Sequence, residues 1–202
     1  MTNLNIKVVS DAILQVAIFS QTARFTTYMV LPNDTFTVSW HPFYLDPSLP
    51  KTGIDRNVHL ARKIEPERME WATTYLSSLG TTEGINFSWQ GKVGTARDAQ
   101  RLVQLAKTKS SETEDRLVST MFKVHFEERG DILSQDVLVA IGEKASLDKS
   151  EVKEWLDRGK GGQKVDQEVP EAYKKGIRGV PHFTIKRSIR AISTGSSEGM
   201  SC

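Results

Sequence analysis

The stretch "GIRGVPHFTI" at residues 176–185 decides how the chain is interpreted. Gly179, Val180 and Pro181 lead directly into an apolar run whose composition is typical of a strand. Proline brings no N–H to a strand ladder, so it rarely stands at the entrance of a well-paired strand. Pro181 therefore marks a special turn, which serves either a site or only the entry into the strand.

The segments around this stretch predict an α/β domain. Alternating and β-branched residues predict strands over 4–10 and 35–45, and helical spacing predicts a helix over 11–30 between them. From about residue 53 to 160 the pattern is helical. A helix over 166–179, interrupted by Pro170, then precedes two short strands at 182–185 and 190–193.

Strands on both sides of a helical block are expected to complete one sheet, with the block as an insertion. The predicted divisions are a first β-α-β part, a helical insertion, a second α-β-β part and a disordered tail, at 1–52, 53–162, 163–193 and 194–202. A chain of 202 residues is long enough to bury a substantial core as one domain.

Composition limits the function classes. The formal charge of +2 is too small to indicate a nucleic-acid partner. No stretch approaches 18 apolar residues and the N-terminus lacks the pattern of a signal peptide, so we expect a cytoplasmic protein without a membrane partner. The one cysteine, Cys202, excludes a disulfide framework and a cysteine zinc site within the chain, and the histidines have no metal-ligand spacing.

Four segments in order carry a resemblance: "VVSD" at 8–11, "SWHPFYLDP" at 39–47, "GTARDAQRLVQLAK" at 94–107, and the stretch around Pro181. Together they resemble the DsbA family, and most closely its FrnE-like branch. That branch is related to 2-hydroxychromene-2-carboxylate isomerases and kappa-class glutathione transferases. The resemblance implies a thioredoxin-like fold with a large all-helical insertion, a cis Val180–Pro181 bond and, by family, thiol–disulfide oxidoreductase activity.

The redox motif of that family is missing. Its members usually continue with Cys-Pro-Trp-Cys, in which a helix N-terminus lowers the pKa of the first thiol and the second thiol resolves the mixed disulfide. Leu14 and Ala17 stand at those positions, and neither can form a thiolate. The family's Asn and His in the insertion become Thr95 and Gln100. Either the protein has diverged and no longer carries out thiol–disulfide exchange, or the gene model misassigns both ends of the chain.

No catalytic residue of the family is therefore intact. Ser10 is a weak candidate and is better interpreted as a helix cap. The resemblance implies a substrate cleft, and we expect it to be lined by Asp11, Trp40, His41, Phe43, Trp89, Thr95, Gln100, Val180 and Pro181. We expect Trp71, Trp155 and His125 in the core instead.

Three functions remain open at this point. The first is an oxidoreductase family member that is inactive in dithiol exchange. The second is a glutathione-dependent transferase or isomerase, and the third is a cleft that binds without turnover, with a role in secondary metabolism. The resemblance implies a small-molecule or peptide thiol as substrate, glutathione as the candidate cofactor and a homodimer as the assembly.

Overall fold

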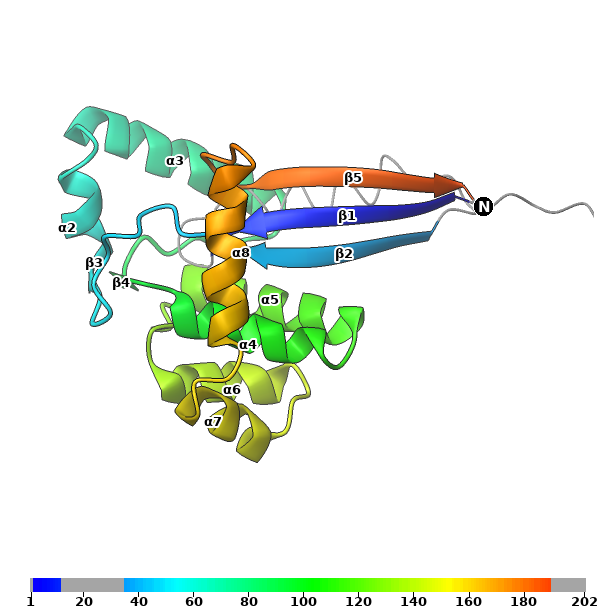
Figure 1. Ribbon diagram of the computed structural model, residues 1–202. Coiled ribbons are helices and arrows are strands. Elements are labelled where there is room, and N and C mark those ends of the chain that lie inside the picture. The colour runs from blue at the N-terminus through cyan, green and yellow to red at the C-terminus, as the bar shows by residue number, and fades with distance from the viewer. Residues whose placement is uncertain (1, 12–34, 190–202) are drawn as a thin grey trace, which may run out of the picture.

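The strands at the two ends of the chain form one mixed sheet. The computed structural model describes residues 2–11 and 35–189 (Figure 1). β1 (Thr2–Ser10) lies between β2 (Thr35–Pro42), which is parallel to it, and β5 (His182–Ile189), which is antiparallel. This arrangement confirms the prediction of a thioredoxin-like sheet completed by strands on both sides of a helical insertion.

Two strand boundaries differ from the prediction. β2 ends at Pro42 rather than at Leu45, because Pro42 has no N–H with which to continue the ladder. β5 continues to Ile189 rather than ending at Ile185, since it pairs with β1 along its whole length, from His182 opposite Val9 to Ile189 opposite Thr2. The predicted helix over 11–30, apart from residue 11, the predicted strand over 190–193 and the tail over 194–202 lie outside the described residues.

The segment between β2 and the last described helix is mainly helical, as predicted. It also contains a short antiparallel pairing of β3 (Ile54–Asp55) with β4 (Lys92–Val93). Its helices are α2 (Arg56–Ala61), α3 (Pro66–Thr82), α4 (Arg97–Lys107), α5 (Ser111–Phe126), α6 (Gln135–Lys144) and α7 (Lys149–Asp157). α8 (Gly162–Lys174) then crosses the sheet at the carboxyl end of β1 and leads to β5 (Figure 1).

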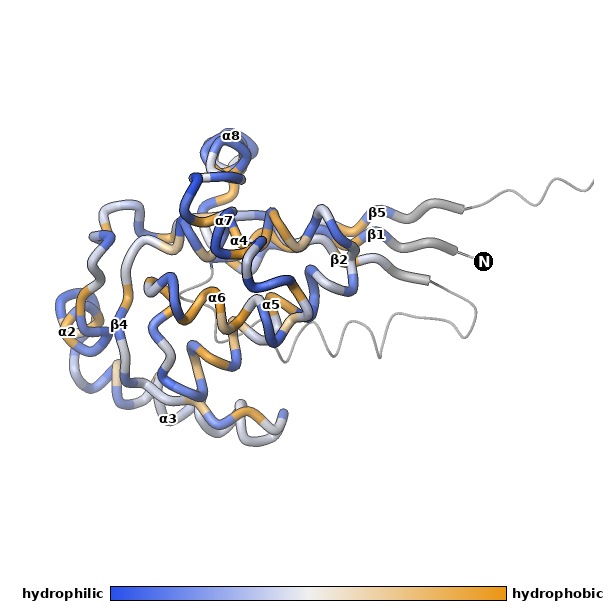
Figure 2. Tube along the Cα trace, turned by 90° about the horizontal axis from the view of Figure 1, so that it is seen from below, coloured by the Kyte–Doolittle hydropathy of each residue, from blue (hydrophilic) through white to orange (hydrophobic). Residues whose placement is uncertain are grey.

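The sheet is apolar on one face. Ile6, Val8 and Trp40 are buried and belong to the main core together with α4 and α5. Successive side chains of a strand point to opposite faces, and Lys7 and Thr37 accordingly lie exposed on the other face. Along the helices, apolar and hydrophilic stretches also alternate (Figure 2), here with the longer period of a helix. This pattern is typical of helices that bury one side.

Helix α4 lies at the centre of the core. Its residues 99–106 are all buried, including the apolar side chains of Leu102, Leu105 and Ala106. It packs against α5, α6, α7 and α8. The long family-like segment at 94–107 is therefore the framework on which the other helices are assembled.

Two helix ends differ from what the sequence suggests, since Thr95 stands in the position of a cap and Ser111 and Glu114 have the spacing of a capping box. Thr95 does not cap α4, because the helix begins after Ala96 and has no side-chain cap. The predicted box of Ser111 and Glu114 is wrong as well. Ser110 caps α5 by accepting from the N–H of Thr113, while Glu114 accepts from the N–H of Trp40 at 2.7 Å.

The structure also tests the expected effect of Pro170 on α8 and the expected burial of three aromatic side chains. Pro170 does not interrupt α8, since burial of Val169 before it and of Ala172 after it favours a continuous helix. His125 is buried, as predicted. Trp71 is 67% exposed, so its placement in the core is wrong, and Trp155 is only half-buried, donating to the carbonyl of Arg101.

Candidate functional site

The candidate site lies where the loop before β5 meets the carboxyl end of β1. The Val180–Pro181 peptide bond in this loop is cis. A small apolar cluster, separate from the main core, holds the loop in place. It is formed by Val9, Phe43, Ala172 and Ile177, with Tyr173 and Val180 packed against it. These residues come from β1, the segment after β2, α8 and the loop itself, so four parts of the chain meet here.

Phe43 is central to this cluster. Its side chain is only 1% exposed, and its ring centroid lies 4.8 Å from that of Tyr173. The Tyr173 hydroxyl donates to the carbonyl of Tyr44, the next residue along the chain. The segment after β2 is therefore attached to α8 by a ring contact and by a hydrogen bond at adjacent positions.

Asp11 ties the end of β1 to the same segment. It is 4% exposed, and its Oδ2 accepts from the backbone N–H of Leu45 at 2.7 Å. Its negative charge also reaches the tyrosines: burial first, and Asp11 second, raise the pKa of Tyr173. The structure thus brings the predicted residues Asp11, Phe43 and Val180 to one place.

A buried phenol borders this region. Within the described residues, the Tyr44 hydroxyl is buried and has no hydrogen-bond partner. Burial raises the pKa of Tyr44 to about 12, although the nearby guanidinium of Arg97 lowers it. Arg97 itself is held by Asp166 through two hydrogen bonds of 2.9 and 2.7 Å. Tyr44 is therefore a neutral hydrogen-bond donor at ordinary pH.

Trp40 and Gln100 lie behind the end of β1 rather than on an open surface. The Gln100 amide donates to the carbonyl of Ser10 at 3.1 Å, and all three residues are buried. They line a recess of about 10 Å³, which is the room of about one water molecule. This recess is too small for a peptide, so Gln100 and Trp40 support the site from within.

His41 points toward α8. Its Nδ1 lies 2.8 Å from Oε2 of Glu168, and its Nε2 lies 3.3 Å from the hydroxyl of Ser39. Glu168, Tyr44 and Tyr173 were not among the predicted site residues. Tyr44 stands inside a family-like segment, but the two α8 residues carried no signal, since helical spacing does not reveal which face meets the sheet.

Two predicted cleft residues do not join the others. Trp89 donates its indole N–H to the Ser77 hydroxyl of α3 at 2.9 Å, and its ring lies tilted against that of Phe87, so these two partners belong to the insertion. Thr95 is half-buried, and its backbone N–H donates to the carbonyl of Pro50. Leu14 and Ala17 lie outside the described residues.

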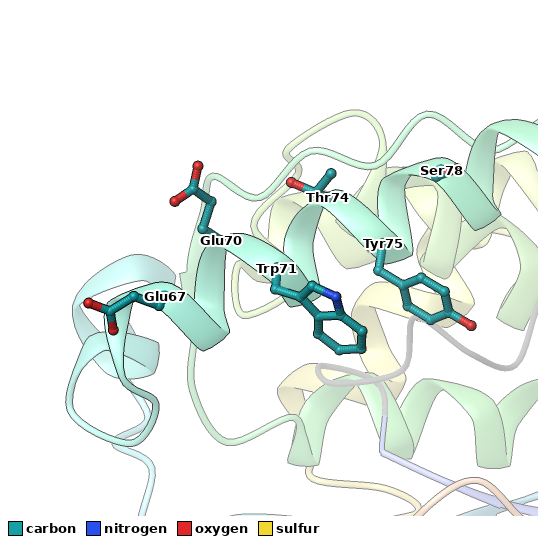
Figure 3. Close-up of a pocket in the computed structure, with 6 residues that line it drawn as sticks. All are labelled: Glu67, Glu70, Trp71, Thr74, Tyr75 and Ser78. Carbon is teal, nitrogen blue, oxygen red and sulfur yellow. The ribbon is translucent and has the colours of Figure 1, made fainter.

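A second hollow lies on the surface of α3 (Figure 3). It is lined by Glu67, Glu70, Trp71, Thr74, Tyr75 and Ser78, all from this one helix. The rings of Trp71 and Tyr75 are stacked, 5.2 Å apart and nearly parallel. None of these residues belongs to the predicted cleft, and α3 takes no part in the cluster around Val180.

Two classes of feature are not found among residues 2–11 and 35–189. No group of three or more His, Cys, Asp or Glu side chains in this part of the chain is placed to hold a metal ion. No helix there is long and apolar enough to cross a membrane.

Comparison with known proteins agrees with this geometry. A family model described as the DSBA-like thioredoxin domain matches residues 18–198. The chain belongs to this family. No curated protein matches it in sequence. As a member of the DSBA-like family with a single cysteine, it has no Cys-x-x-Cys motif and no pair of thiols for dithiol exchange.

Several solved structures share the fold at low identity. A probable DsbA oxidoreductase from Streptomyces coelicolor matches with a TM-score of 0.78 and 22% identity, over 90% of this chain and 80% of that one. A 2-hydroxychromene-2-carboxylate isomerase matches with a TM-score of 0.65 and 11% identity, over 89% and 84%. The cytosolic disulfide reductase DsbM from Pseudomonas aeruginosa matches with a TM-score of 0.60 and 13% identity, over 92% of this chain and 89% of that one.

Proposed function

We propose that this DSBA-like protein binds a thiol-containing peptide of the size of glutathione at the loop around Val180 and Pro181, without exchanging disulfides. The observation that carries the proposal is the cluster of Val9, Phe43, Ala172 and Ile177, which fixes this loop beside the end of β1 although the chain has no thiol pair. The loop can thus contact an extended ligand although the chain has no redox centre.

The loop suits an extended ligand for a general reason. The residue before a cis proline at this place presents its backbone N–H and C=O to a passing peptide, and backbone pairing supplies affinity that does not depend on side chains. Val180 is half-buried, with its side chain packed on the cluster. A structure of DsbM from Pseudomonas aeruginosa with GSH, similar to this chain with a TM-score of 0.60, supports glutathione as the first ligand to test.

The similarity to an isomerase favours a second candidate, a glutathione-dependent isomerase or transferase. Such an enzyme needs a hydrogen-bond donor that holds the sulfur of glutathione as a thiolate, and it needs no protein thiol. Ser10 ends β1 and Tyr44 follows Phe43 of the cluster, and both carry a hydroxyl. Tyr44 suits this role better, because its phenol stays neutral at ordinary pH and has no partner among the described residues.

Calorimetry of the full chain with reduced glutathione and with S-methylglutathione tests the first proposal. We expect saturable binding of both, since the contacts involve the peptide backbone. An insulin reduction assay should stay at the rate of dithiothreitol alone. Absence of saturable heat with either ligand would overturn the proposal.

Turnover separates the two candidates. An isomerase or transferase would convert a substrate in the presence of glutathione, and Tyr44→Phe would lower that rate while leaving the affinity for S-methylglutathione unchanged. Binding without any glutathione-dependent conversion of an electrophile such as 1-chloro-2,4-dinitrobenzene leaves the binding protein as the function.

We propose a homodimer in the cytoplasm that belongs to the FrnE-like branch and has a role in secondary metabolism. We also propose that residues 53–162 act as an insertion between the two parts of the thioredoxin-like domain. Light scattering after size exclusion tests the dimer, and cell fractionation tests the location.

A further inference from the structure

The polar face of the sheet carries a group of side chains that the peptide site does not use. Lys7 and Thr37 are exposed on this face, while Ser39 and His41 are half-buried beside α8. Lys7 stands directly opposite Ser39 in the β1–β2 register, so both side chains leave the sheet on the same side. A hydroxyl, an imidazole and an ammonium therefore lie close together at the edge of α8.

The geometry joins three of these groups in a chain. The Ser39 Oγ lies 3.3 Å from the Nε2 of His41, and the Nδ1 of the same ring lies 2.8 Å from Oε2 of Glu168. An ionised carboxylate only accepts hydrogen bonds, so Nδ1 carries the ring proton. The lone pair of Nε2 is then directed at the serine hydroxyl, in the tautomer that a general base needs.

Glu168 is held in its ionised form. Its side chain is 12% exposed. Burial raises the pKa of Glu168, but the hydrogen bond with His41 and the ammonium of Lys107 outweigh that effect and lower it overall. Lys164, one turn earlier on α8, lies 3.6 Å from its other oxygen. The carboxylate is thus a fixed orienting group for the imidazole.

Positive charge gathers around the same place. The Lys107 ammonium acts on Glu168 and Glu114, and it is in turn affected by the ammonium groups of Lys164 and Lys7. Lys164 lies beside Glu168, and Lys7 stands opposite Ser39 in the strand register, so lysines from α8 and β1 border the group. Their charge can attract an anionic substrate.

We propose that Ser39, His41 and Glu168 form a nucleophilic triad that hydrolyses small esters bearing a carboxylate on the acyl part. The same three roles recur on unrelated folds, and they are recognised by geometry rather than by position in the chain. This activity is independent of the loop around Val180 and of any thiol.

The chemical steps balance within the site. Ser39 Oγ attacks the ester carbonyl and its proton passes to Nε2 of His41. The carbon–oxygen bond to the alcohol then breaks, and the alcohol leaves with that proton. Water, deprotonated by the same imidazole, attacks the acyl-serine, which releases the carboxylic acid and restores Ser39. Because Ser39 and His41 are half-buried at the edge of α8, we expect slow turnover of small substrates.

The test uses the full chain with p-nitrophenyl hydrogen succinate and the neutral p-nitrophenyl acetate. We expect faster hydrolysis of the anionic ester and loss of catalysis in Ser39→Ala. His41→Gln should lower the rate about 10²-fold, as expected for loss of a general base. The rate of Glu168→Gln should lie between those of wild type and His41→Gln. Thr37→Ala is the matched control, since Thr37 lies on the same face two residues before Ser39 and outside the triad.

A second measurement follows the wild-type chain alone. A fluorophosphonate probe should form a covalent bond with Ser39, located by peptide mass mapping, and Glu168→Gln should slow the labelling. Modification of lysines without Ser39, or equal rates in Ser39→Ala and wild type, would overturn the proposal. Failure of glutathione binding would leave it untouched, since the two sites share no ligand.

Discussion

Replacement of Phe43 by alanine tests how the loop around Val180 is held. Phe43 is 1% exposed and is the largest buried side chain of its cluster. Truncation of a buried phenylalanine costs about 3–5 kcal/mol, of which the ring pair with Tyr173 accounts for about 0.5–1.5 kcal/mol. Because the cluster is small and separate from the main core, we expect the loss to loosen the loop as well as to lower the free energy of unfolding.

The assay compares two truncations of similar cost. Leu105→Ala also removes a side chain that is 1% exposed, but in the main core, with an expected cost of about 2–5 kcal/mol. Urea unfolding gives both free energies, and calorimetry with glutathione is done where both variants are folded. We expect Phe43→Ala to weaken glutathione binding at least tenfold and Leu105→Ala to leave it unchanged. Equal affinities in the two variants would refute the reasoning.

Three further variants test single features of the fold. Burial raises the pKa of Glu114, so the native state binds its proton more tightly than the unfolded state. Stability should therefore fall as the pH rises from about 4, and Glu114→Gln should remove that slope in urea unfolding while its amide oxygen still accepts from Trp40. Gly161→Ala should lower the melting temperature more than Gly159→Ala. Both glycines have positive φ, which costs a residue with a Cβ about 1–2 kcal/mol. Only at Gly161 would the added Cβ also crowd the indole ring of Trp155, 3.0 Å away. Trp71→Phe should lower the fraction of fluorescence that acrylamide quenches, since Trp71 is 67% exposed, Trp40 only 5%, and Trp89 and Trp155 are half-buried; an unchanged quenched fraction would contradict this placement.

The order of strands and helices could be predicted from the sequence because it depends on local patterns. Alternation marks β1 and β2, and the family-like segments fix their order. The same segments place Asp11, Phe43 and Val180 near one another, and the structure brings these three together. Their convergence follows from the topology, since each stands at or next to an end of a strand or at the loop that enters one.

Features that depend on packing between distant elements could not be predicted. Ser111 and Glu114 have the spacing of a capping box, but Glu114 instead accepts from an N–H of the edge strand β2, which would otherwise be buried without a partner. Glu168 and Tyr173 lie on a helix with few apolar residues, so the face that meets the sheet was not visible in the pattern. Residue type alone favours a core position for Trp71, whereas α3 buries only Gly80 among its residues.

The lack of a thiol pair is physically compatible with a firmly held loop. The described contacts that hold Val180 come from Phe43, Tyr173, Val9 and their neighbours, and these are packing residues. Dithiol exchange needs two thiols, whereas this packing needs only apolar side chains. The loop can therefore stay in place in a chain with one cysteine, and this is why we propose peptide binding without disulfide exchange.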